Sequence, residues 1–374
     1  LSSKKQRKDC DTFDFSKPEE IPLVTIQLPV FNEMYVMERL LDNIALLEYP
    51  KNKLEIQVLD DSTDETVETT KAHIEQLAKT GLNISHIGHF INFNGTAGVW
   101  RKECIIDAGN WEGDTLTEDL DLSYRAQLKN WEFKYLEDVE TPAELPIVIS
   151  AARSQQFRWN KGGAENFRKM LKRVIKSDNI STKTKIHGLL HLLNSTMFLS
   201  IFIVAVLSIP MLYIKNEYAH LRNYFYVMSF FVMSTIIFFV CYWFMYKSIY
   251  GSGFKKFFGY IGMFFTFFSI AMGFSLHNSI AVLEGHVGKR SEFVRTPKFN
   301  LSKYKDNLKN NKYLRKNLSP HVVIEGILML YFAFGMYSAF IVGDQGGDFG
   351  LFPFHLMLFI GFGYVFFKSL SSKV

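Results

Sequence analysis

Two pairs of neighbouring carboxylates stand where this sequence could carry out chemistry. Asp60 and Asp61 form the first pair and directly follow an apolar, β-branched run at residues 54–59, which is typical of a buried strand. In open α/β sheets, ligands bind beyond the carboxyl ends of the strands, and acidic residues there can hold hydroxyls, a base or a metal ion. The dipeptide is equally compatible with a turn, with residues 62–64 capping the next helix.

Glu118 and Asp119 form the second pair, at the expected start of a helix. A carboxylate held at a helix N-terminus beside a cleft could accept a proton from a hydroxyl group. The alternative is that Thr117, Glu118 and Asp119 only cap that helix. Asp119 and Asp121 also spell Asp-x-Asp, but on a helix their side chains diverge by about 200°, so we do not predict a metal site there.

Gln155, Arg158 and Trp159 follow each other at positions i, i+3 and i+4, which share one face of a helix. A guanidinium suits a diphosphate, an indole stacks on the apolar face of a sugar ring, and an amide can satisfy hydroxyl groups. A helix lying on a membrane surface would also use Arg and Trp, so this pattern is compatible with either a ligand-binding face or an interfacial helix.

Three residues of a basic segment, Arg295, Thr296 and Lys298, could close over phosphates as a lid. The bias of cytoplasmic loops toward Lys and Arg explains their charge equally well.

The composition narrows the class of protein that could position these residues. Of the 374 residues, 48% are hydrophobic and only 21% charged, which excludes a disordered, collagen-like or coiled-coil protein. The net charge of +5 is small and uneven, so no nucleic-acid partner is predicted. Cys10, Cys104 and Cys241 lie far apart without a Cys-x-x-Cys pair, so neither a zinc site nor disulfides are predicted, and a reducing cytosolic face is expected.

The pattern of hydropathy changes near residue 186. Before it, the runs at 23–31 and 54–61 predict buried parallel strands joined by helices. After it, four apolar runs have the length of a bilayer crossing, namely residues 186–214, 221–246, 322–342 and 351–367. The fold class predicted is therefore a Rossmann-like α/β cytosolic domain followed by an all-α transmembrane domain.

A further apolar run at 257–283 is placed by charge. The loop 286–318 is rich in Lys and Arg and is expected in the cytosol, as are Lys247, Lys255 and Lys256. With both flanks on one side, we predict a re-entrant, interfacial or hairpin element, with a plain fifth crossing as the alternative.

These patterns divide the chain into four predicted parts. Residues 1–21 are a basic linker expected to follow an upstream transmembrane segment, and residues 22–149 form the α/β domain. Residues 150–185 combine basic and apolar side chains and are predicted to lie in the lipid headgroup plane, with the basic groups facing anionic lipid. Residues 186–374 form the membrane domain.

In order along the chain, these residues resemble the processive family-2 glycosyltransferases, the cellulose-synthase-like membrane enzymes that include plant mannan and glucan synthases and their bacterial relatives. The resemblance runs from about Pro22 to the C-terminus. Its carriers are LPVFNE (28–33), VLDDSTDET (58–66), FNGTAGVWRK (93–102), DTLTEDLDLSYRAQL (114–128), QQFRW (155–159) and FVRTPK (293–298).

The resemblance implies a GT-A nucleotide-sugar-binding domain and roles for the residues named above. Phe31, Glu33, Asp60 and Asp61 would contact the nucleotide, and Asp119 would be the catalytic base of an inverting transfer. The acceptor and diphosphate would be held by Gln155, Arg158, Trp159 and Glu118, and a gating loop would contain Arg295, Thr296 and Lys298. A divalent cation, Mg²⁺ or Mn²⁺, would neutralise the departing diphosphate.

The resemblance also implies the partners and the cellular location. These are a nucleotide-sugar donor, a glycan acceptor and the lipid bilayer of the inner or plasma membrane, with the catalytic domain in the cytoplasm. The membrane half would conduct the growing β-glycan outward, and His191, Asn194 and Glu325 could line that conduit.

The sequence departs from the family between Ile87 and Phe93. The family has an Asp-x-Asp metal-binding element and at least one further βαβ unit there, but no Asp occurs between Asp64 and Asp107. Either a segment near residues 87/88 is absent from this sequence, which we favour, or the deletion is real and the protein is a catalytically inactive scaffold. The metal ligands therefore stay unknown.

Three functions are compatible with these residues. We favour a membrane-integrated synthase that polymerises hexose from UDP-glucose or GDP-mannose and exports the β-glycan. The alternatives are single-sugar transfer to a membrane lipid, such as ceramide or polyprenyl phosphate, and a non-catalytic membrane scaffold. The sequence pattern predicts no single donor, linkage, chain length or oligomeric state.

Overall fold

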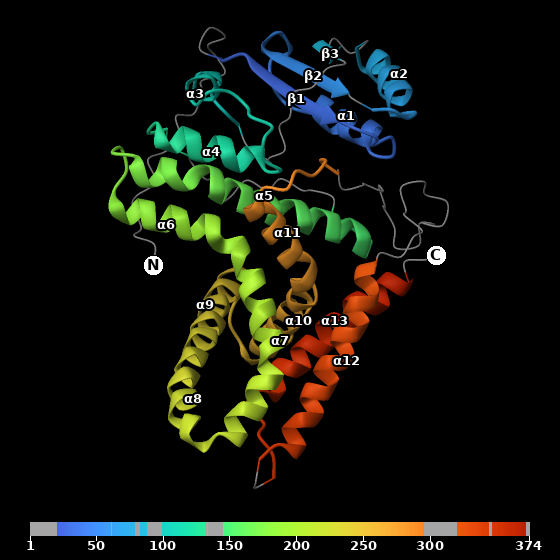
Figure 1. The fold of residues 1–374 in the computed structure, drawn as a ribbon. Helices are drawn as coiled ribbons and strands as arrows, with labels where there is room; N and C mark the ends of the chain where they lie inside the picture. Colours follow the sequence, from blue (N-terminus) through green and yellow to red (C-terminus); the bar gives the residue numbers. More distant parts are fainter. Residues whose placement is uncertain are drawn as a thin grey trace. The chain divides into compact units, whose positions relative to one another are not determined.

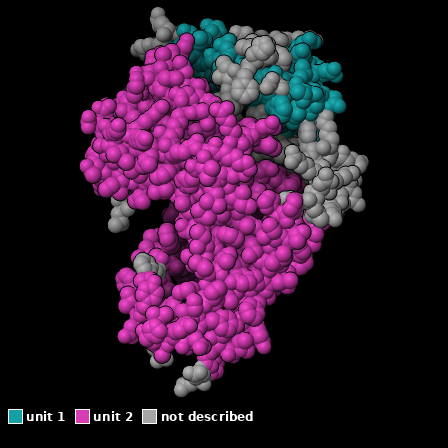
Figure 2. All heavy atoms as spheres, viewed as in Figure 1, with its two compact units in different colours: residues 1–96, 141–145, 297–306 teal, residues 97–140, 146–296, 307–374 magenta. Residues whose placement is uncertain are grey.

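The computed structural model describes residues 21–60, 62–78, 83–87, 99–131, 133, 145–294, 320–343 and 346–371. The chain divides into two compact units (Figure 2), which are described separately. Unit 1 comprises residues 1–96, 141–145 and 297–306, and unit 2 comprises residues 97–140, 146–296 and 307–374. Residues 97–140, which the sequence pattern grouped with the α/β domain, thus cluster with the helical part of the chain.

The described part of unit 1 is a parallel three-stranded sheet in the order β1-β2-β3 (Figure 1). Its strands are β1 (Val24–Val30), β2 (Leu54–Asp60) and β3 (Asn83–Ile87), and its helices are α1 (Met37–Ala45) and α2 (Thr66–Ala78). Val30 pairs with Asp60, so β1 and β2 end at the same edge. Leu28, Val30, Ile56 and Val58 form the core with apolar residues of α1 and α2. This confirms the predicted parallel strands joined by helices.

The first four helices of unit 2 belong to no sheet in the part of the chain that the structure describes. They are α3 (Lys102–Asp107), α4 (Glu118–Leu128), α5 (Ile149–Lys176) and α6 (Thr182–Leu192). Helix α5 packs against both α4 and α6 (Figure 1). Met170 and Val174 of α5 are buried with Leu192, and Tyr124 and Leu128 of α4 pack against them.

The other helices described in unit 2 are apolar. These are α7 (Thr196–Glu217), α8 (Arg222–Met228), α9 (Val232–Tyr250), α10 (Phe254–Gly273), α11 (Ser275–Val287), α12 (Pro320–Ile341) and α13 (Phe352–Ser371). Within the described residues, five helical segments are long and apolar enough to cross a bilayer: Thr182–Glu217, Ala219–Tyr250, Phe254–Gly273, Pro320–Ile341 and Phe352–Ser371. Four correspond to the predicted crossings.

The fifth segment, α10, falls within the run for which a re-entrant element was predicted. The structure breaks that run at Phe274 into α10 and the separate helix α11, which packs on α5 and α7. By length and composition α10 satisfies the requirement for a crossing, which was the alternative interpretation. Gly273 of α10 lies so close to α13 that an added Cβ would come within 2.3 Å of the Gly361 carbonyl oxygen. Small residues are required for such close helix packing.

Helix α5 differs from a simple headgroup-plane helix in where its charges lie. Arg153 and Lys161 are buried and Lys169 is half-buried. All three form ion pairs with carboxylates of the protein, namely with Glu325, with Glu284, and with Glu112, Asp114 and Asp121. The sequence pattern predicted that the basic groups of this segment face anionic lipid. These three groups instead pair with carboxylates that lie far away in the sequence.

Candidate active site

The edge where β1 and β2 end is built around Asn32. Its side chain accepts a hydrogen bond from the Thr63 backbone N–H (2.9 Å), while its own backbone N–H donates to Ser62 Oγ (2.8 Å). Asn32 has φ +51°, a left-handed conformation that asparagine tolerates better than most residues. The loops after the two strands are thus tied together at the carboxyl edge of the sheet, which is the ligand-binding edge of such sheets.

The predicted nucleotide-binding residues lie at this edge of unit 1. Glu33 and Asp60 are buried, at 3% and 5% exposure, whereas Phe31 is exposed. Asp60 Oδ1 accepts the Ser62 backbone N–H at 3.0 Å, so this aspartate also serves the turn interpretation. Asp61 lies outside the described residues.

In unit 2, the segment that leads into α4 is held by the middle of α5. The amide of Asn166 donates to Thr117 Oγ1 (2.9 Å) and to the Thr117 carbonyl oxygen (3.0 Å). Gly162 lies beneath the same threonine, and a Cβ on Gly162 would meet Thr117 Oγ1 at 2.5 Å. The Leu116 N–H donates to Glu165 Oε2 at 2.8 Å. One face of α5 therefore fixes the backbone just before Glu118 and Asp119.

The two predicted acidic residues then occupy the first turn of α4. Glu118 is buried at 3% exposure, and Asp119 is half-buried with Oδ1 accepting the Leu120 N–H at 2.8 Å. Thr117 is the N-cap residue, but its side chain makes no capping bond to α4, because Asn166 engages it instead. The first turn of a helix stabilises negative charge, so a carboxylate is favourably placed there.

Gln155, Arg158 and Trp159 lie on the same α5 stripe, closer to the N-terminus of the helix. At about 100° per residue, positions 155, 158, 159, 162, 166 and 169 fall within one face of a helix. Trp159 is 47% exposed and Gln155 is half-buried. Gly162, which contacts Thr117, follows Trp159 by less than one helical turn. The predicted acceptor-binding face and the Thr117–Asp119 segment thus share one helix.

Arg158 contacts the chain just before the predicted gating loop. Its guanidinium carbon lies 4.5 Å from the centre of the Phe293 ring, and Nη1 donates to the Val294 carbonyl oxygen at 3.3 Å. Buried Lys161 pairs with Glu284 at 3.1 Å and also contacts Ser291 Oγ. Burial alone would raise the pKa of Glu284, but the hydrogen bonds from Lys289 and Lys161 outweigh it and lower that pKa. Arg295, Thr296 and Lys298 lie outside the described residues.

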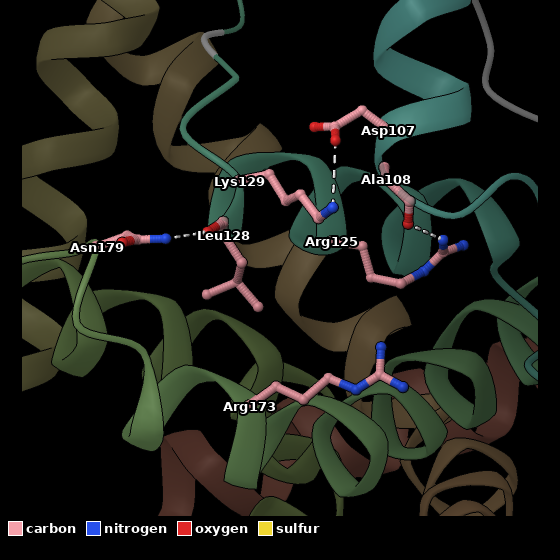
Figure 3. A pocket seen from close by; sticks show the side chains of 7 residues that line it. All are labelled: Asp107, Ala108, Arg125, Leu128, Lys129, Arg173 and Asn179. Carbon is pink, nitrogen blue, oxygen red and sulfur yellow. Dashed lines mark hydrogen bonds and ion pairs between the residues drawn. The ribbon is translucent and has the colours of Figure 1, made fainter.

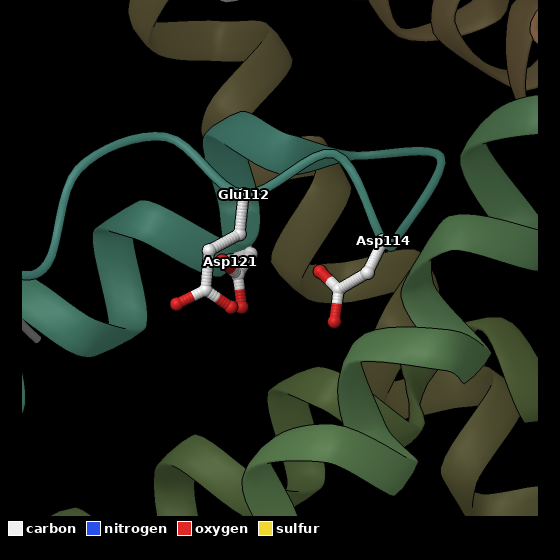
Figure 4. A group of neighbouring side chains, drawn as sticks. All are labelled: Glu112, Asp114 and Asp121. Carbon is white, nitrogen blue, oxygen red and sulfur yellow. The ribbon is translucent and has the colours of Figure 1, made fainter.

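Glu112, Asp114 and Asp121 form the one group of carboxylates in the described residues whose spacing could suit a metal ion (Figure 4). The ammonium group of Lys169 already binds all three, at 2.7, 2.6 and 2.9 Å. Arg125 adds a second cation, 2.7 Å from Asp121. The hydrogen bond from Lys169 is the main cause that lowers the pKa of Glu112. These residues therefore do not fit a divalent cation, and they act as an ion-pair network.

A cavity of about 560 Å³ lies beside α4 (Figure 3). It is lined by Asp107, Ala108, Arg125, Leu128, Lys129, Arg173 and Asn179. Hydrogen bonds from Trp131 and then from Lys129 lower the pKa of Asp107. None of the predicted site residues lines this cavity, so we do not assign it to the site.

Comparisons with known proteins find similarity to glycosyltransferases. A family profile described as glycosyl transferase family group 2 matches residues 62–247. Glucomannan 4-beta-mannosyltransferase 1 of Oryza sativa subsp. japonica is 28% identical over 281 residues, covering 49% of this chain and 54% of the relative. Glucomannan 4-beta-mannosyltransferase 7 of Arabidopsis thaliana is 27% identical over 255 residues, covering 43% and 46% of the two chains.

This chain is a homologue of the cellulose-synthase-like family-2 glycosyltransferases. This chain spans about half the length of these curated relatives. A solved mannosyltransferase from Pyrobaculum calidifontis, in complex with GDP-Man and Mn²⁺, aligns with a TM-score of 0.35 and 16% identity, over 46% of this chain and 68% of that chain. A TM-score of that size does not establish a common fold.

Sequence reasoning missed the residues of this homologue that hold the site segment. Gly162, Glu165, Asn166 and Lys169 follow each other at i, i+3, i+4 and i+7, which is the spacing of one helix face. That spacing, on a helix face with few apolar residues, was the signal in the sequence that this face of α5 contacts another part of the protein. Asn32, placed directly after a strand, was the corresponding signal in unit 1. The predicted junction at residues 87/88 reaches beyond the described residues, since residue 88 lies outside them.

Proposed function

We propose that this chain is the hexose-transferring and membrane-spanning part of a β-glycan synthase with a GT-A catalytic domain. The observation that carries the proposal is the contact of Thr117 with Gly162 and Asn166. It holds the Thr117–Asp119 segment on the helix that bears Gln155, Arg158 and Trp159. A proton acceptor, a cation for a diphosphate and an aromatic platform for a sugar thereby come from adjoining secondary-structure elements.

Asp119 acts as the general base in this proposal. Its carboxylate takes the proton of an acceptor hydroxyl, and the hydroxyl oxygen then attacks the anomeric carbon of the donor sugar. The bond from that carbon to the diphosphate breaks, and the nucleoside diphosphate leaves with the electron pair. Attack on the face opposite the leaving group inverts the configuration and gives a β-linkage from an α-linked donor.

Arg158 stabilises charge on the diphosphate, and Trp159 stacks on the acceptor sugar, with Gln155 and Glu118 binding hydroxyl groups. Phe31, Glu33, Asp60 and Asp61 contact the nucleotide. Support for these roles comes from the family resemblance, from the exposure of Trp159 and Phe31, and from the position of Asp60 at the carboxyl edge of the sheet.

Two further elements of the proposal come from the family resemblance rather than from contacts in this chain. Arg295, Thr296 and Lys298 belong to a gating loop, and the apolar helices conduct the product out of the cytoplasm across the inner or plasma membrane. A requirement for Mg²⁺ or Mn²⁺ is proposed on the same basis, with ligands outside the described carboxylate group. The mannosyltransferase names of the relatives favour GDP-mannose over UDP-glucose as the donor.

A donor screen tests this function. The chain in lipid nanodiscs is incubated with labelled GDP-mannose, UDP-glucose and other nucleotide sugars, with Mg²⁺, Mn²⁺ or EDTA. We expect release of one nucleoside diphosphate, formation of a β-linked polymer, and loss of both with EDTA. A lipid that carries a single sugar as the product would favour lipid glycosylation over polymerisation. No turnover of any donor would leave the scaffold interpretation.

A further inference from the structure

A buried ion pair joins α5 to two membrane helices. Arg153 Nη2 contacts Glu325 of α12 and donates to Ser369 Oγ of α13 at 2.8 Å. The side chains of Arg153 and Glu325 are 9% and 1% exposed, and Ser369 is 6% exposed. The Ser369 hydroxyl donates to the Val365 carbonyl oxygen, so its lone pairs remain available to Arg153.

This arrangement explains why an acidic residue is present in α12. A carboxylate in a bilayer-crossing helix is costly unless it is paired or lines water. Glu325 was predicted to line the glycan conduit, but the structure pairs it with a cation that comes from outside the crossing helices. The Glu325 charge therefore pairs with a residue 172 positions away in the chain.

The position of Arg153 on α5 gives that contact a consequence for the site. Arg153 precedes Gln155 by two residues, so the two side chains diverge by about 200° around the helix. One face of α5 bears Gln155, Arg158 and Trp159 and holds Thr117, whereas Arg153 points to α12 and α13. The first turns of α5 are therefore held by α12 and α13 on the side opposite to the Gln155–Trp159 face.

We propose that Arg153 and Glu325, with Ser369, are positioning residues that set the N-terminal half of α5, and with it the Gln155–Trp159 face, on the membrane helices. The proposal rests on the function proposed above, because it assigns the pair to the geometry of that site. Removing one member leaves a buried charge without its partner, which destabilises strongly, whereas exchanging both members keeps the pair.

A charge-exchange experiment tests the pair. Arg153→Glu, Glu325→Arg, the double exchange, and the milder Glu325→Gln and Ser369→Ala variants are compared in nanodiscs. We expect a loss of turnover per folded molecule of about tenfold or more in the single reversals, and recovery in the double exchange. Glu325→Gln, which keeps an acceptor, should lose less.

Lys215 and Asp348 provide a control pair in the same unit. Their ion pair, 2.7 Å long and more exposed, joins α7 to the segment before α13. Reversal of either should leave turnover per folded molecule unchanged. Hydrogen exchange over residues 149–160 supplies a readout that needs no enzymatic activity. It should accelerate in the Arg153 and Glu325 single variants alone and recover in the double exchange.

The outcomes separate the two proposals. Unchanged exchange and unchanged turnover in Glu325→Gln and in folded single reversals would overturn the positioning role. Loss of thermal stability with normal turnover per folded molecule would show a merely structural pair and would also overturn it. If the wild-type chain turned over no donor, the proposed function would fail, while hydrogen exchange would still decide whether the pair sets α5.

Discussion

The amide group of Asn166 reaches Thr117 twice, at the hydroxyl (2.9 Å) and at the carbonyl oxygen (3.0 Å). The same carbonyl accepts the Asp121 N–H in the first turn of α4. Asn166 is fully buried, so these bonds are shielded from water. Helix α5 thereby determines where α4 begins, and with it the position of the Asp119 carboxylate.

Replacing Asn166 with alanine should displace that carboxylate without removing any group that binds the donor. We expect kcat to fall about 10- to 100-fold, because small displacements of reacting groups have effects of that size, while nucleoside diphosphate affinity stays near the wild-type value. Steady-state kinetics and calorimetry with the nucleoside diphosphate measure the two quantities. Asn160→Ala is the control, because Asn160 is buried on the same helix but donates to the Gln156 carbonyl of α5 itself. Equal losses in both variants would contradict the positioning role of Asn166.

Gly162 should tolerate no side chain. A Cβ at this position would meet Thr117 Oγ1 at 2.5 Å and Cγ2 at 2.6 Å, so Gly162→Ala must push the Thr117 segment away from α5. Turnover should fall at least tenfold, by the same effect of displaced reacting groups. Gly113→Ala is the matched variant, since an added Cβ there would meet nothing within 4 Å. Wild-type turnover in a folded Gly162→Ala protein would argue against the contact.

Lys169 should be the main stabilising cation of the acidic segment before α4. Lys169→Met leaves Glu112, Asp114 and the fully buried Asp121 without that cation, and losing one partner of a buried pair costs about 3 kcal/mol or more. Two of the carboxylates are partly exposed, which reduces the effect. Thermal unfolding in detergent measures the loss, with the exposed Lys172→Met as control.

The same variant makes a prediction about pH. Lys169 lowers the pKa of Glu112, so the stability from this carboxylate is present above its unfolded-state pKa and is lost as pH falls through the lower folded-state value. The difference in melting temperature between wild type and Lys169→Met should therefore be largest near neutral pH and shrink in acid. A difference that grows in acid would contradict the ion-pair account.

Glu165 should show the opposite dependence. Burial raises its pKa against the hydrogen bond from Leu116, so ionising this carboxyl at neutral pH costs stability. Its raised pKa contributes stability below the unfolded-state value, and this contribution is lost as pH rises through the folded-state value. Glu165→Gln keeps an acceptor for the Leu116 N–H and avoids the charge. We expect its melting temperature to equal or exceed wild type at neutral pH and to lose that advantage in acid.

Local patterns in the sequence predicted the elements and the faces they present. β1 and β2 were predicted from short β-branched runs, and the face with Gln155, Arg158 and Trp159 from helical spacing, because both depend on neighbouring residues only. The partner of Asn166 lies 49 residues away, and that of Arg153 lies 172 residues away. No periodicity encodes such pairs, so Glu325 was predicted to line a conduit and Lys161 to face lipid. Tertiary contacts instead pair both of them.

The central claim is that Asp119 is the proton acceptor of a sugar transfer, and Asp119→Asn tests it most directly. This variant keeps the size of the side chain and an acceptor oxygen for the Leu120 N–H, but it removes the basic group. Single-turnover transfer from the donor found by the screen is measured beside Asp178→Asn, an exposed aspartate between α5 and α6. We predict a loss of at least about 100-fold for Asp119→Asn with unchanged donor binding, since general-base catalysis contributes on that order, and no loss for Asp178→Asn. Transfer at the wild-type rate by Asp119→Asn would contradict the account.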